Sequence, residues 1–282
     1  MKHRFACVVA ALACGALLLT GCIAQETYTP KQKDPAVGAD ALQEEGVLKV
    51  GVDTSPGKAP LAGLSGTRVV GLDVDLAVWL ADEMGLKLQI VDVAEDPVAA
   101  LESGQVDILL GLSSDDKSAS VWKSDAYLTT GTALFSTDPN AEVPADDSEP
   151  SISAEAAKAS AWLVANEFGA GSLVSAIDMG EVFEMLRDGD VQFAAADALI
   201  GAYAAFTVHC DAYPVALMQK TSDYCVGVLA DNTALQQAIS TAMSKLANNG
   251  ILTKIVETKW LGKPYSLEGV PYTELAQEHA GE

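Results

Sequence analysis

One carboxylate stands alone in an apolar stretch of the second half of the chain. Asp197 lies in VQFAAADALIGAY, residues 191–203, with hydrophobic residues on both sides. A buried carboxylate without a partner costs several kcal/mol or stays protonated. Asp197 is therefore expected to face a helix N-terminus, a cationic side chain or a bound cation.

The sequence offers little for catalysis or for metal binding. Its histidines, His3, His209 and His279, are too scattered to predict a Ser-His-Asp triad or a multi-histidine metal site. It has no GxxxxGK[ST] loop, and the glycines of GLSGTRVVG do not open a helix as a dinucleotide site requires. We predict no catalytic residue, no metal and no cofactor.

Residues 1–22 have the pattern of an export signal. A basic start is followed by an apolar run that ends at Leu19, and residues 19–22 read LTGC, which resembles a bacterial lipobox. We expect cleavage before Cys22 and diacylation of its thiol. The exported chain would then be tethered to the outer face of the cytoplasmic membrane, or to the periplasmic side of a membrane. A simple membrane-anchored N-terminus is the alternative.

The charge balance limits the partners of the chain. It has 17 basic and 39 acidic residues, a net charge of −22, and loss of residues 1–22 removes two basic residues and no acid, leaving −24. This charge predicts no binding to nucleic acid and contact with a membrane through the lipid only.

Cysteine usage predicts one disulfide. Cys7 and Cys14 belong to the signal and Cys22 would carry lipid, so that Cys210 and Cys225 remain as one pair in an oxidising compartment. Bonded, they would close a loop of about 15 residues, worth on the order of 3 kcal/mol. Two reduced, buried thiols are the alternative.

The remaining chain predicts two small α/β lobes. After a polar spacer at residues 23–45, strands near 47–53, 86–93 and 106–111 alternate with helices near 74–84 and 97–104. The order repeats with strands near 152, 172–176 and 191–197 and helices near 160–168 and 179–187. Such alternation is typical of mainly parallel sheets flanked by helices.

Six segments carry a resemblance to a known family. They read LKVGVD, VVGLDVDLAVWLADEMGLKLQIV, ALESGQVDILLGLS, SDAYLTTGTALF, LRDGDVQFAAADALIGAY and NNGILTKIVETKWLG. Together they make residues 47–262 similar to the solute-binding proteins of polar amino acid ABC transporters. The resemblance implies a periplasmic-binding-protein type II fold, with two lobes joined by crossover strands near residues 133–136 and 226–230.

The resemblance also implies a division of the chain and a function. The parts would be a lipoprotein signal peptide (1–22), a flexible tether (23–45), lobe 1 (46–134 plus 226–264), lobe 2 (135–225) and a C-terminal tail (265–282). The protein would be a monomer that captures a small polar or zwitterionic solute, an amino acid, and delivers it to an ABC permease with its ATPase. In this family, the aspartate that matches Asp197 accepts hydrogen bonds from the ligand ammonium. A helix N-cap is the alternative role for Asp197.

The sequence departs from the family where the ligand carboxylate and side chain would bind. Lys117 stands nearest the expected arginine and lacks its planar fork, so it either contacts the ligand or is simply solvated. Leu61, after Pro60, replaces an aromatic residue, and AAKASAW replaces the usual Gly-Ser/Thr loop. The predicted ligand-binding set is Asp197, Ser113, Ser114, Lys117, Pro60, Leu61, Tyr127, Ser160 and Trp162.

Two other function classes stay open at this point. A dehydratase-like enzyme of the same fold would use a carboxylate as general acid or base. A surface sensor or adhesin would use the fold without transport. A permease and an ATPase encoded next to this chain would favour uptake over both.

Overall fold

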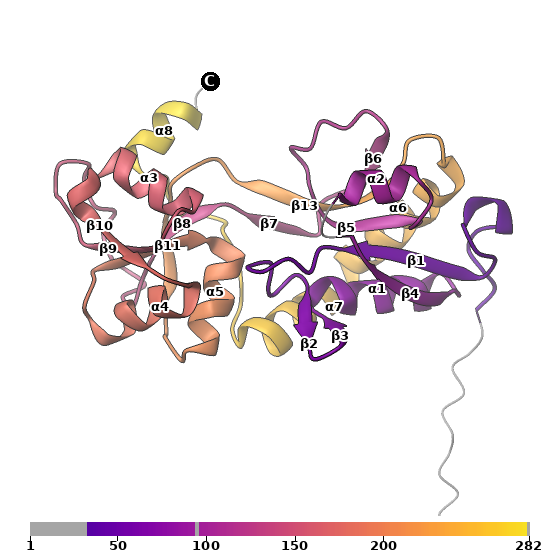
Figure 1. Ribbon diagram of the computed structural model, residues 1–282, viewed down its shortest axis with the longest axis horizontal. Helices are drawn as coiled ribbons and strands as arrows, with labels where there is room; N and C mark the ends of the chain where they lie inside the picture. Colours follow the sequence, from indigo (N-terminus) through magenta and orange to yellow (C-terminus); the bar gives the residue numbers. More distant parts are fainter. Residues whose placement is uncertain (1–32, 94–95, 281–282) are drawn as a thin grey trace, which may run out of the picture. The chain divides into compact units, whose positions relative to one another are not determined.

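Two sheets organise the chain, and each has helices packed beside it (Figure 1). The structure, a computed structural model, describes residues 33–93 and 96–280. The first sheet has the order β4-β1-β5-β13-β6, with β7 also paired to β13, and we call it with its helices lobe 1. Its strands are β1 (Val47–Val52), β4 (Lys87–Asp92), β5 (Ile108–Ser113), β6 (Val121–Lys123), β7 (Leu128–Thr130) and β13 (Ser222–Leu229).

The second sheet, which with its helices we call lobe 2, has the order β10-β9-β11-β8-β12. Parallel pairs β1–β4 and β1–β5 in lobe 1 match β10–β9 and β11–β9 in lobe 2, while β8, β12 and β13 pair antiparallel. The predicted architecture of two α/β lobes is therefore confirmed. The strands are β8 (Thr132–Ser136), β9 (Ile152–Glu155), β10 (Leu173–Ala176), β11 (Phe193–Asp197) and β12 (Tyr213–Leu217).

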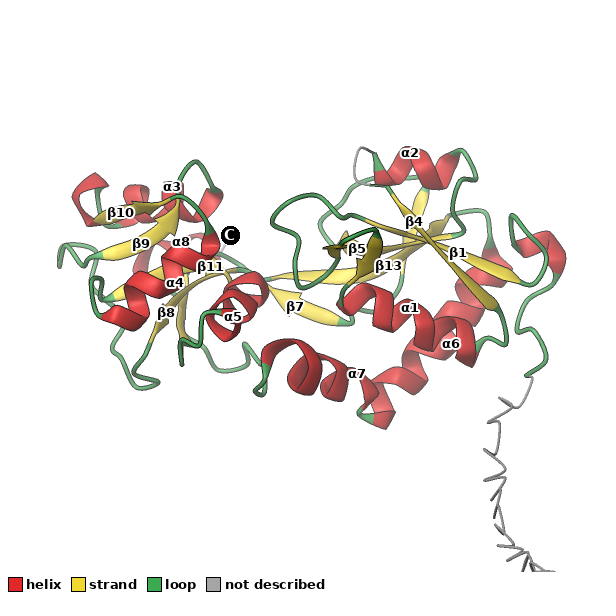
Figure 2. Cartoon of the chain, turned by 60° about the horizontal axis from the view of Figure 1, so that its bottom comes forward, coloured by secondary structure: helices red, strands yellow, loops and turns green. Residues whose placement is uncertain are grey.

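Helices appear where capping residues and apolar periodicity predict them (Figure 2). Asp96 accepts a hydrogen bond from Ala99 N, and Asp178 accepts one from Glu181 N. Such N-cap bonds satisfy donors that a helix leaves free.

No helix in residues 33–93 or 96–280 is long and apolar enough to cross a bilayer. Lobe 1 has α1 (Leu72–Glu83), α2 (Pro97–Glu102), α6 (Thr233–Asn249), α7 (Ile251–Lys254), η3 (Ile255–Leu261), η1 (Ala39–Ala41) and the hairpin β2 (Gly63–Ser65) with β3 (Arg68–Val70); lobe 2 has α3 (Ala159–Glu167), η2 (Ala170–Ser172), α4 (Met179–Asp188), α5 (Ala198–Thr207) and α8 (Glu274–Ala280).

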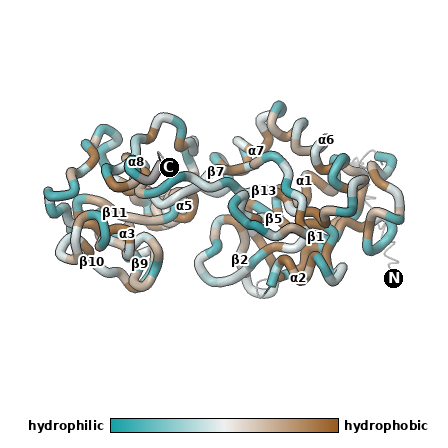
Figure 3. The backbone as a smooth tube through the Cα atoms, turned by 90° about the horizontal axis from the view of Figure 1, so that it is seen from above, coloured by the Kyte–Doolittle hydropathy of each residue, from teal (hydrophilic) through white to brown (hydrophobic). Residues whose placement is uncertain are grey.

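Each lobe has an apolar interior, and hydrophobic segments run through both (Figure 3). In lobe 1, Val50 of β1 and Leu76 of α1 are fully buried. In lobe 2, the fully buried rings of Phe135 and Phe183 meet edge to face, with centroids 5.1 Å apart. Edge-to-face packing is a favoured aromatic geometry, and it joins α4 to the sheet.

The chain passes between the sheets at two points close to the end of β11. Thr130 ends β7 in lobe 1 and Thr132 begins β8 in lobe 2, so the first passage is at Gly131. The second lies between β12 and β13, at residues 218–221. Both passages come a few residues before the boundaries expected at 134 and 225, because β8 and β13 belong entirely to one sheet each.

Residues after η3 return to lobe 2 and pair with its edge strand. Leu217 of β12 donates its N–H to Pro271 O (2.8 Å) and accepts from Thr273 N (2.9 Å). Leu275 N donates to the Glu167 carboxylate at 3.1 Å. The segment expected as a C-terminal tail therefore packs against lobe 2 along residues 271–275.

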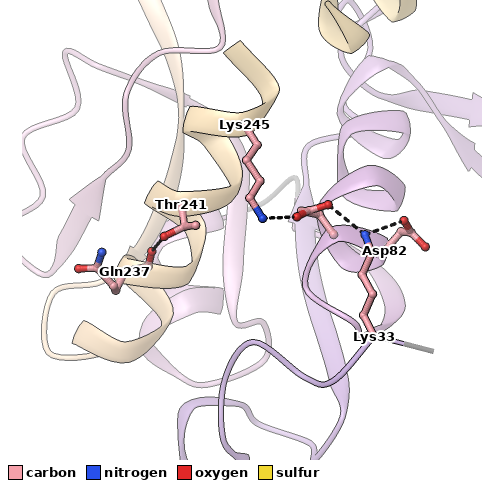
Figure 4. Close-up of polar contacts among 6 residues, drawn as sticks. Lys33, Asp82, Gln237, Thr241 and Lys245 are labelled. Carbon is pink, nitrogen blue, oxygen red and sulfur yellow. Dashed lines mark hydrogen bonds and ion pairs between the residues drawn. The ribbon is translucent and has the colours of Figure 1, made fainter. Parts of the chain in front are cut away.

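The start of the described chain is bound to lobe 1 by ion pairs (Figure 4). Lys33 pairs with Asp82 (3.3 Å) and Glu83 (2.9 Å) of α1, and Lys245 of α6 also pairs with Glu83 (2.6 Å). Further on, Gln43 N donates to the Asp107 carboxylate at 2.7 Å. Of the expected tether, residues 33–45 thus contact lobe 1, and residues 23–32 lie outside the described residues, as does the signal with Cys22.

The predicted disulfide is not formed. Cys210 and Cys225 are both free, buried thiols. Cys210 follows α5 in lobe 2, whereas Cys225 lies in β13 opposite Leu112 of lobe 1. Compartment and even count were the grounds for the bond, and neither brings together residues that belong to different lobes. The structure matches the alternative prediction, two reduced and buried thiols.

Candidate functional site

Asp197 lies at the junction of a buried strand, a helix and the passage between the lobes. It ends β11, and its Oδ1 caps α5 by accepting from Leu199 N and Ile200 N, each at 3.0 Å. Its Oδ2 accepts from Thr130 Oγ1 of β7 at 2.8 Å. Burial raises the pKa of Asp197 above its ordinary value, although these hydrogen bonds act in the opposite direction. The cap and a further contact therefore coexist on one carboxylate.

The charge of this carboxylate acts on two tyrosines. Burial, together with the negative charge of Asp197, raises the pKa of both Tyr224 and Tyr265. Tyr265 donates its hydroxyl to Thr129 O at 2.8 Å. These side chains come from β13 and from the segment after η3, two further parts of the chain besides β7 and β11.

A second buried carboxylate belongs to the first turn of α1. Asp73 is 2% exposed, and its Oδ1 accepts from the Tyr127 hydroxyl at 2.7 Å, which in turn accepts from Gly111 N at 2.8 Å. Burial raises the pKa of Asp73 to about 7. The carboxyl therefore changes its charge near neutral pH.

The shifted pKa of Asp73 makes a prediction for the pH dependence of stability. An unfolded chain ionises this carboxyl near its usual pKa of 3.8, while the folded protein keeps it protonated up to about pH 7. Its contribution to stability is therefore present at low pH and is lost as the pH rises between these values. The variant Asp73→Asn keeps an acceptor and cannot ionise, so its melting temperature should gain on the wild type by about 3 °C or more from pH 4 to pH 8. Parallel melting profiles of the two proteins over this range would contradict the assignment.

Lys58, in the loop after β1, carries a positive charge that acts on both buried carboxylates. The Nζ of Lys58 lies 3.1 Å from Asp53 Oδ2, and its positive charge lowers the pKa of Asp73 and of Asp197. The pKa of Asp53 itself lies below its ordinary value, because hydrogen bonds from Ser55 and Lys58 outweigh the opposing effect of burial. Lys58 thus interacts with carboxylates from both lobes.

The loop that carries Lys58 is held against the start of α1. Pro60 O accepts from Leu72 N at 2.8 Å, and Leu61 O accepts from Asp73 N at 2.9 Å. Both Pro60 and Leu61, predicted to contact ligand, are buried. Their described contacts fix the loop beside Asp73.

The predicted serines take part in the architecture of the turn after β5. The hydroxyls of Ser113 and Ser222 are 3.0 Å apart, and Ser114 Oγ accepts from Asp223 N at 3.1 Å. Lys123 donates to the carbonyls of Ser114 and Asp116 and so holds this turn. Lys117 is exposed and has no hydrogen bond or ion pair with any residue in the described ranges.

The remaining predicted residues differ in how much of each is exposed to solvent. Tyr127 is 5% exposed and lies beside Asp73, and Ser160 of α3 is also 5% exposed. Trp162, two residues further along α3, is 66% exposed. Lys158, the N-cap residue of α3, has its Nζ 3.9 Å from where a Cβ at Gly57 would stand.

The site includes residues that sequence reasoning missed. Five residues of the site were not predicted: Lys58, Asp73, Thr130, Tyr224 and Tyr265. Each of them interacts with Asp197 or with another of the five. Asp73 had a signal, since it interrupts the apolar pattern of VVGLDVDLA as Asp197 interrupts its own. In residues 33–93 and 96–280, no group of three or more His, Cys, Asp and Glu side chains could hold a metal ion.

Solved structures share this fold. A polar amino acid ABC uptake transporter substrate binding protein from Streptococcus thermophilus is 16% identical, with a TM-score of 0.68, covering 82% of this chain and 94% of that one. The L-cystine solute receptor of Neisseria gonorrhoeae is 21% identical (TM-score 0.64; 79% and 95% covered). An amino acid ABC transporter substrate-binding protein from Streptococcus pneumoniae bound to L-arginine is 23% identical (TM-score 0.54; 80% and 97% covered).

Identities this low show only that the fold is shared. A family model shows the relationship itself. No curated protein matches the chain. The family described as bacterial extracellular solute-binding proteins, family 3, matches residues 48–263, which include both sheets apart from Val47. They also include Asp197, Asp73, Lys58, Thr130 and Tyr224, but not Tyr265. The chain therefore belongs to the bacterial extracellular solute-binding proteins of family 3.

Proposed function

We propose that this protein is the lipid-anchored substrate-binding component of an ABC importer. It captures a small amino-acid-like solute at the site around Asp197 and delivers it to a membrane permease. The observation that carries the proposal is the partly buried Asp197 carboxylate at the passage between the lobes, held by backbone N–H groups of α5 and by Thr130 of β7.

The ligand ammonium would complete the environment of this carboxylate. The Asp197 oxygens can accept more hydrogen bonds than the two helix N–H groups and one hydroxyl supply. A cation at this position would offset the cost of burial that raises the pKa of Asp197. Tyr224 and Tyr265 would form apolar walls beside the ligand, and Tyr127 would position Asp73.

Support for an amino acid as ligand comes from the relatives. The printed descriptions of the structural neighbours include an L-cystine receptor and an L-arginine complex. The matches cover 95% and 97% of those two chains and 79% and 80% of this one. Transport partners follow from the family alone, in which these proteins serve ABC permeases.

A ligand screen tests the proposal. The purified chain is melted in the presence of each of the twenty amino acids, small amines and short peptides. A ligand bound only by the folded state at 100 times its Kd stabilises it by about 2.7 kcal/mol, which raises the melting temperature of a chain of this size by several degrees. Absence of any shift with all amino acids at millimolar concentration would contradict an amino acid ligand.

Lipid anchoring is tested at Cys22, which lies outside the described residues. We expect the membrane-extracted protein to begin at Cys22 and to carry the mass of a diacylated thiol. Cys22→Ala should lose both the acyl mass and retention on the membrane. An identical mass and identical retention for the two proteins would contradict lipidation.

One observation favours the dehydratase-like alternative. A carboxyl with a pKa of about 7, such as that of Asp73, is matched to general acid or base catalysis at neutral pH. Its Oδ1, however, already accepts from Tyr127, and the side chain is 2% exposed. A buried carboxyl of this kind has little access to a substrate, so binding without conversion is the stronger proposal. Unchanged ligand recovered after long incubation with the protein is the expected result.

A further inference from the structure

The end of the described chain makes a third passage between the lobes (Figure 1). It leaves η3, which contacts α1 in lobe 1, and reaches residues 271–275, which contact β12 and α3 in lobe 2. We call residues 262–275 the strap. Because the family match ends at residue 263, the family relationship does not account for the contacts that the strap makes.

The residues at the start of the strap contact both lobes. Trp260 of η3 donates its Nε1–H to Asp75 Oδ2 of α1 at 2.8 Å, and its ring contacts that of Tyr203 in α5, with centroids 6.1 Å apart. Gly262 lies so close to α5 that a Cβ there would overlap the ring of Phe206. This short stretch therefore joins α1 of lobe 1 to α5 of lobe 2.

The middle of the strap again contacts one lobe and then the other. The Nζ of Lys263 lies 3.1 Å from Asp211 Oδ1 and 4.1 Å from the ring centroid of Tyr213, and both of these residues belong to lobe 2. Two residues later, Tyr265 donates its hydroxyl to Thr129 O of β7, in lobe 1, at 2.8 Å. The same stretch of backbone thus holds groups from both lobes.

The strap is attached beside both of the other passages. Thr129, which accepts from Tyr265, lies two residues before the passage at Gly131. Leu217, which pairs with the end of the strap, directly precedes the passage at residues 218–221. Between these attachments lies a cavity of about 570 Å³, lined by residues 126–129, 217, 221, 265–270 and 272. The cavity leaves the backbone of the passages room to bend.

Two short passages by themselves would act as a hinge. Hinge movement is absorbed by a few loop or element-terminal residues, and the passages at Gly131 and residues 218–221 are of that kind. A further tie that contacts α1, α5 and β12 must be stretched or detached when the lobes turn about this hinge. Such a tie limits how far they turn.

We infer that the strap restricts the movement of the two lobes relative to each other, and that this restriction strengthens ligand binding. Lobes with few accessible arrangements lose less conformational freedom when a ligand fixes one of them. The inference goes beyond the proposed function, because lobe movement can be measured without any ligand.

The experiment lengthens the strap in the full-length chain in detergent. Lys263→Met removes its first contact with lobe 2, and insertion of Gly-Gly-Ser-Gly-Gly-Ser after the exposed Gly269 adds about 20 Å of possible length before the contacts with β12. Spin labels at Lys87→Cys of lobe 1 and Glu184→Cys of lobe 2, both exposed positions, report the distance between the lobes by double electron–electron resonance. Without ligand, the lengthened chain should show a distance distribution wider than that of the wild type by about 1.5-fold or more.

The matched control carries the same insertion after Gly66, in the turn between β2 and β3, where a Cβ likewise meets no atom within 4 Å. It should keep the distribution of the wild type. Tyr265→Phe, which loses only the bond to Thr129 O, should widen the distribution by less than the lengthened chain does. Melting verifies that each variant is folded, and labelling of the unsubstituted chain measures any reaction at the buried Cys210 and Cys225.

The distance distributions decide the inference. Widths equal to that of the control in both strap variants would overturn it and leave the proposed function standing. Calorimetry with a ligand found by the screen should show binding weaker by about threefold or more in the lengthened chain, and affinity equal to that of the control would overturn the contribution to binding. If the wild type binds no amino acid, the proposed function fails, whereas the distances still test the strap.

Discussion

Asp197→Asn should bind an amino acid ligand at least tenfold more weakly than the wild type while keeping most of its stability. The amide oxygen can still accept from Leu199 N and Ile200 N, which hold the start of α5. The amide nitrogen can donate to Thr130 Oγ1, because a hydroxyl also accepts. What is lost is the negative charge that, in the proposed function, would face the ligand ammonium. Truncating one partner of a buried charge pair commonly costs about 2 to 5 kcal/mol of affinity, roughly 30-fold to several thousand-fold.

Two further variants separate binding from capping. Asp197→Ala removes the charge and the cap together, so it should lose affinity and also about 1 kcal/mol of unfolding free energy. Thr130→Val removes only the hydroxyl that donates to Asp197 Oδ2 and should change affinity far less than either aspartate variant. Normal binding by Asp197→Asn in calorimetry, with a lower melting temperature, would reduce Asp197 to a helix cap.

The sequence predicted best what depends on regular periodicity. Asp197 could be found because a buried strand and a helix, each with its own pattern, leave one charged residue at their junction. The same reasoning located α4 from Asp178 and Glu181. The edge pairing of Leu217 with residues 271–273 has no such signal, since it involves one strand residue and an irregular segment.

Loop residues of the site could not be placed from the sequence. Lys58 lies in a loop whose path depends on hydrogen bonds from Leu72 N and Asp73 N, and neither bond has a local pattern in residues 53–62. The disulfide prediction failed for a related reason. Cysteine count and compartment say nothing about distance, and Cys210 and Cys225 belong to different lobes. Helices and strands were therefore predicted more accurately than the contacts between distant loops.

Gly71→Ala should destabilise lobe 1 strongly and disturb the binding site with it. Gly71 precedes α1 with φ of 151°, a backbone conformation that favours glycine. A Cβ at this position would stand 2.1 Å from Leu61 O and 2.7 Å from Ala62 Cα. These are backbone atoms of the loop that follows Lys58, so no side-chain rotation can relieve the clash. We expect a loss of roughly 3 kcal/mol or more of unfolding free energy.

The same substitution should weaken ligand binding, because the clash pushes the loop away from α1. Relief of the contact at Leu61 O would break its hydrogen bond from Asp73 N and shift Lys58 relative to Asp73 and Asp197. Gly63→Ala is the matched control, since a Cβ at Gly63 has no atom within 4 Å and its φ is not in the left-handed region. That variant should stay within about 0.5 kcal/mol of the wild type and bind normally. Denaturant unfolding with calorimetry measures both effects, and equal stability of Gly71→Ala and Gly63→Ala would show that the loop does not pack on α1 as described.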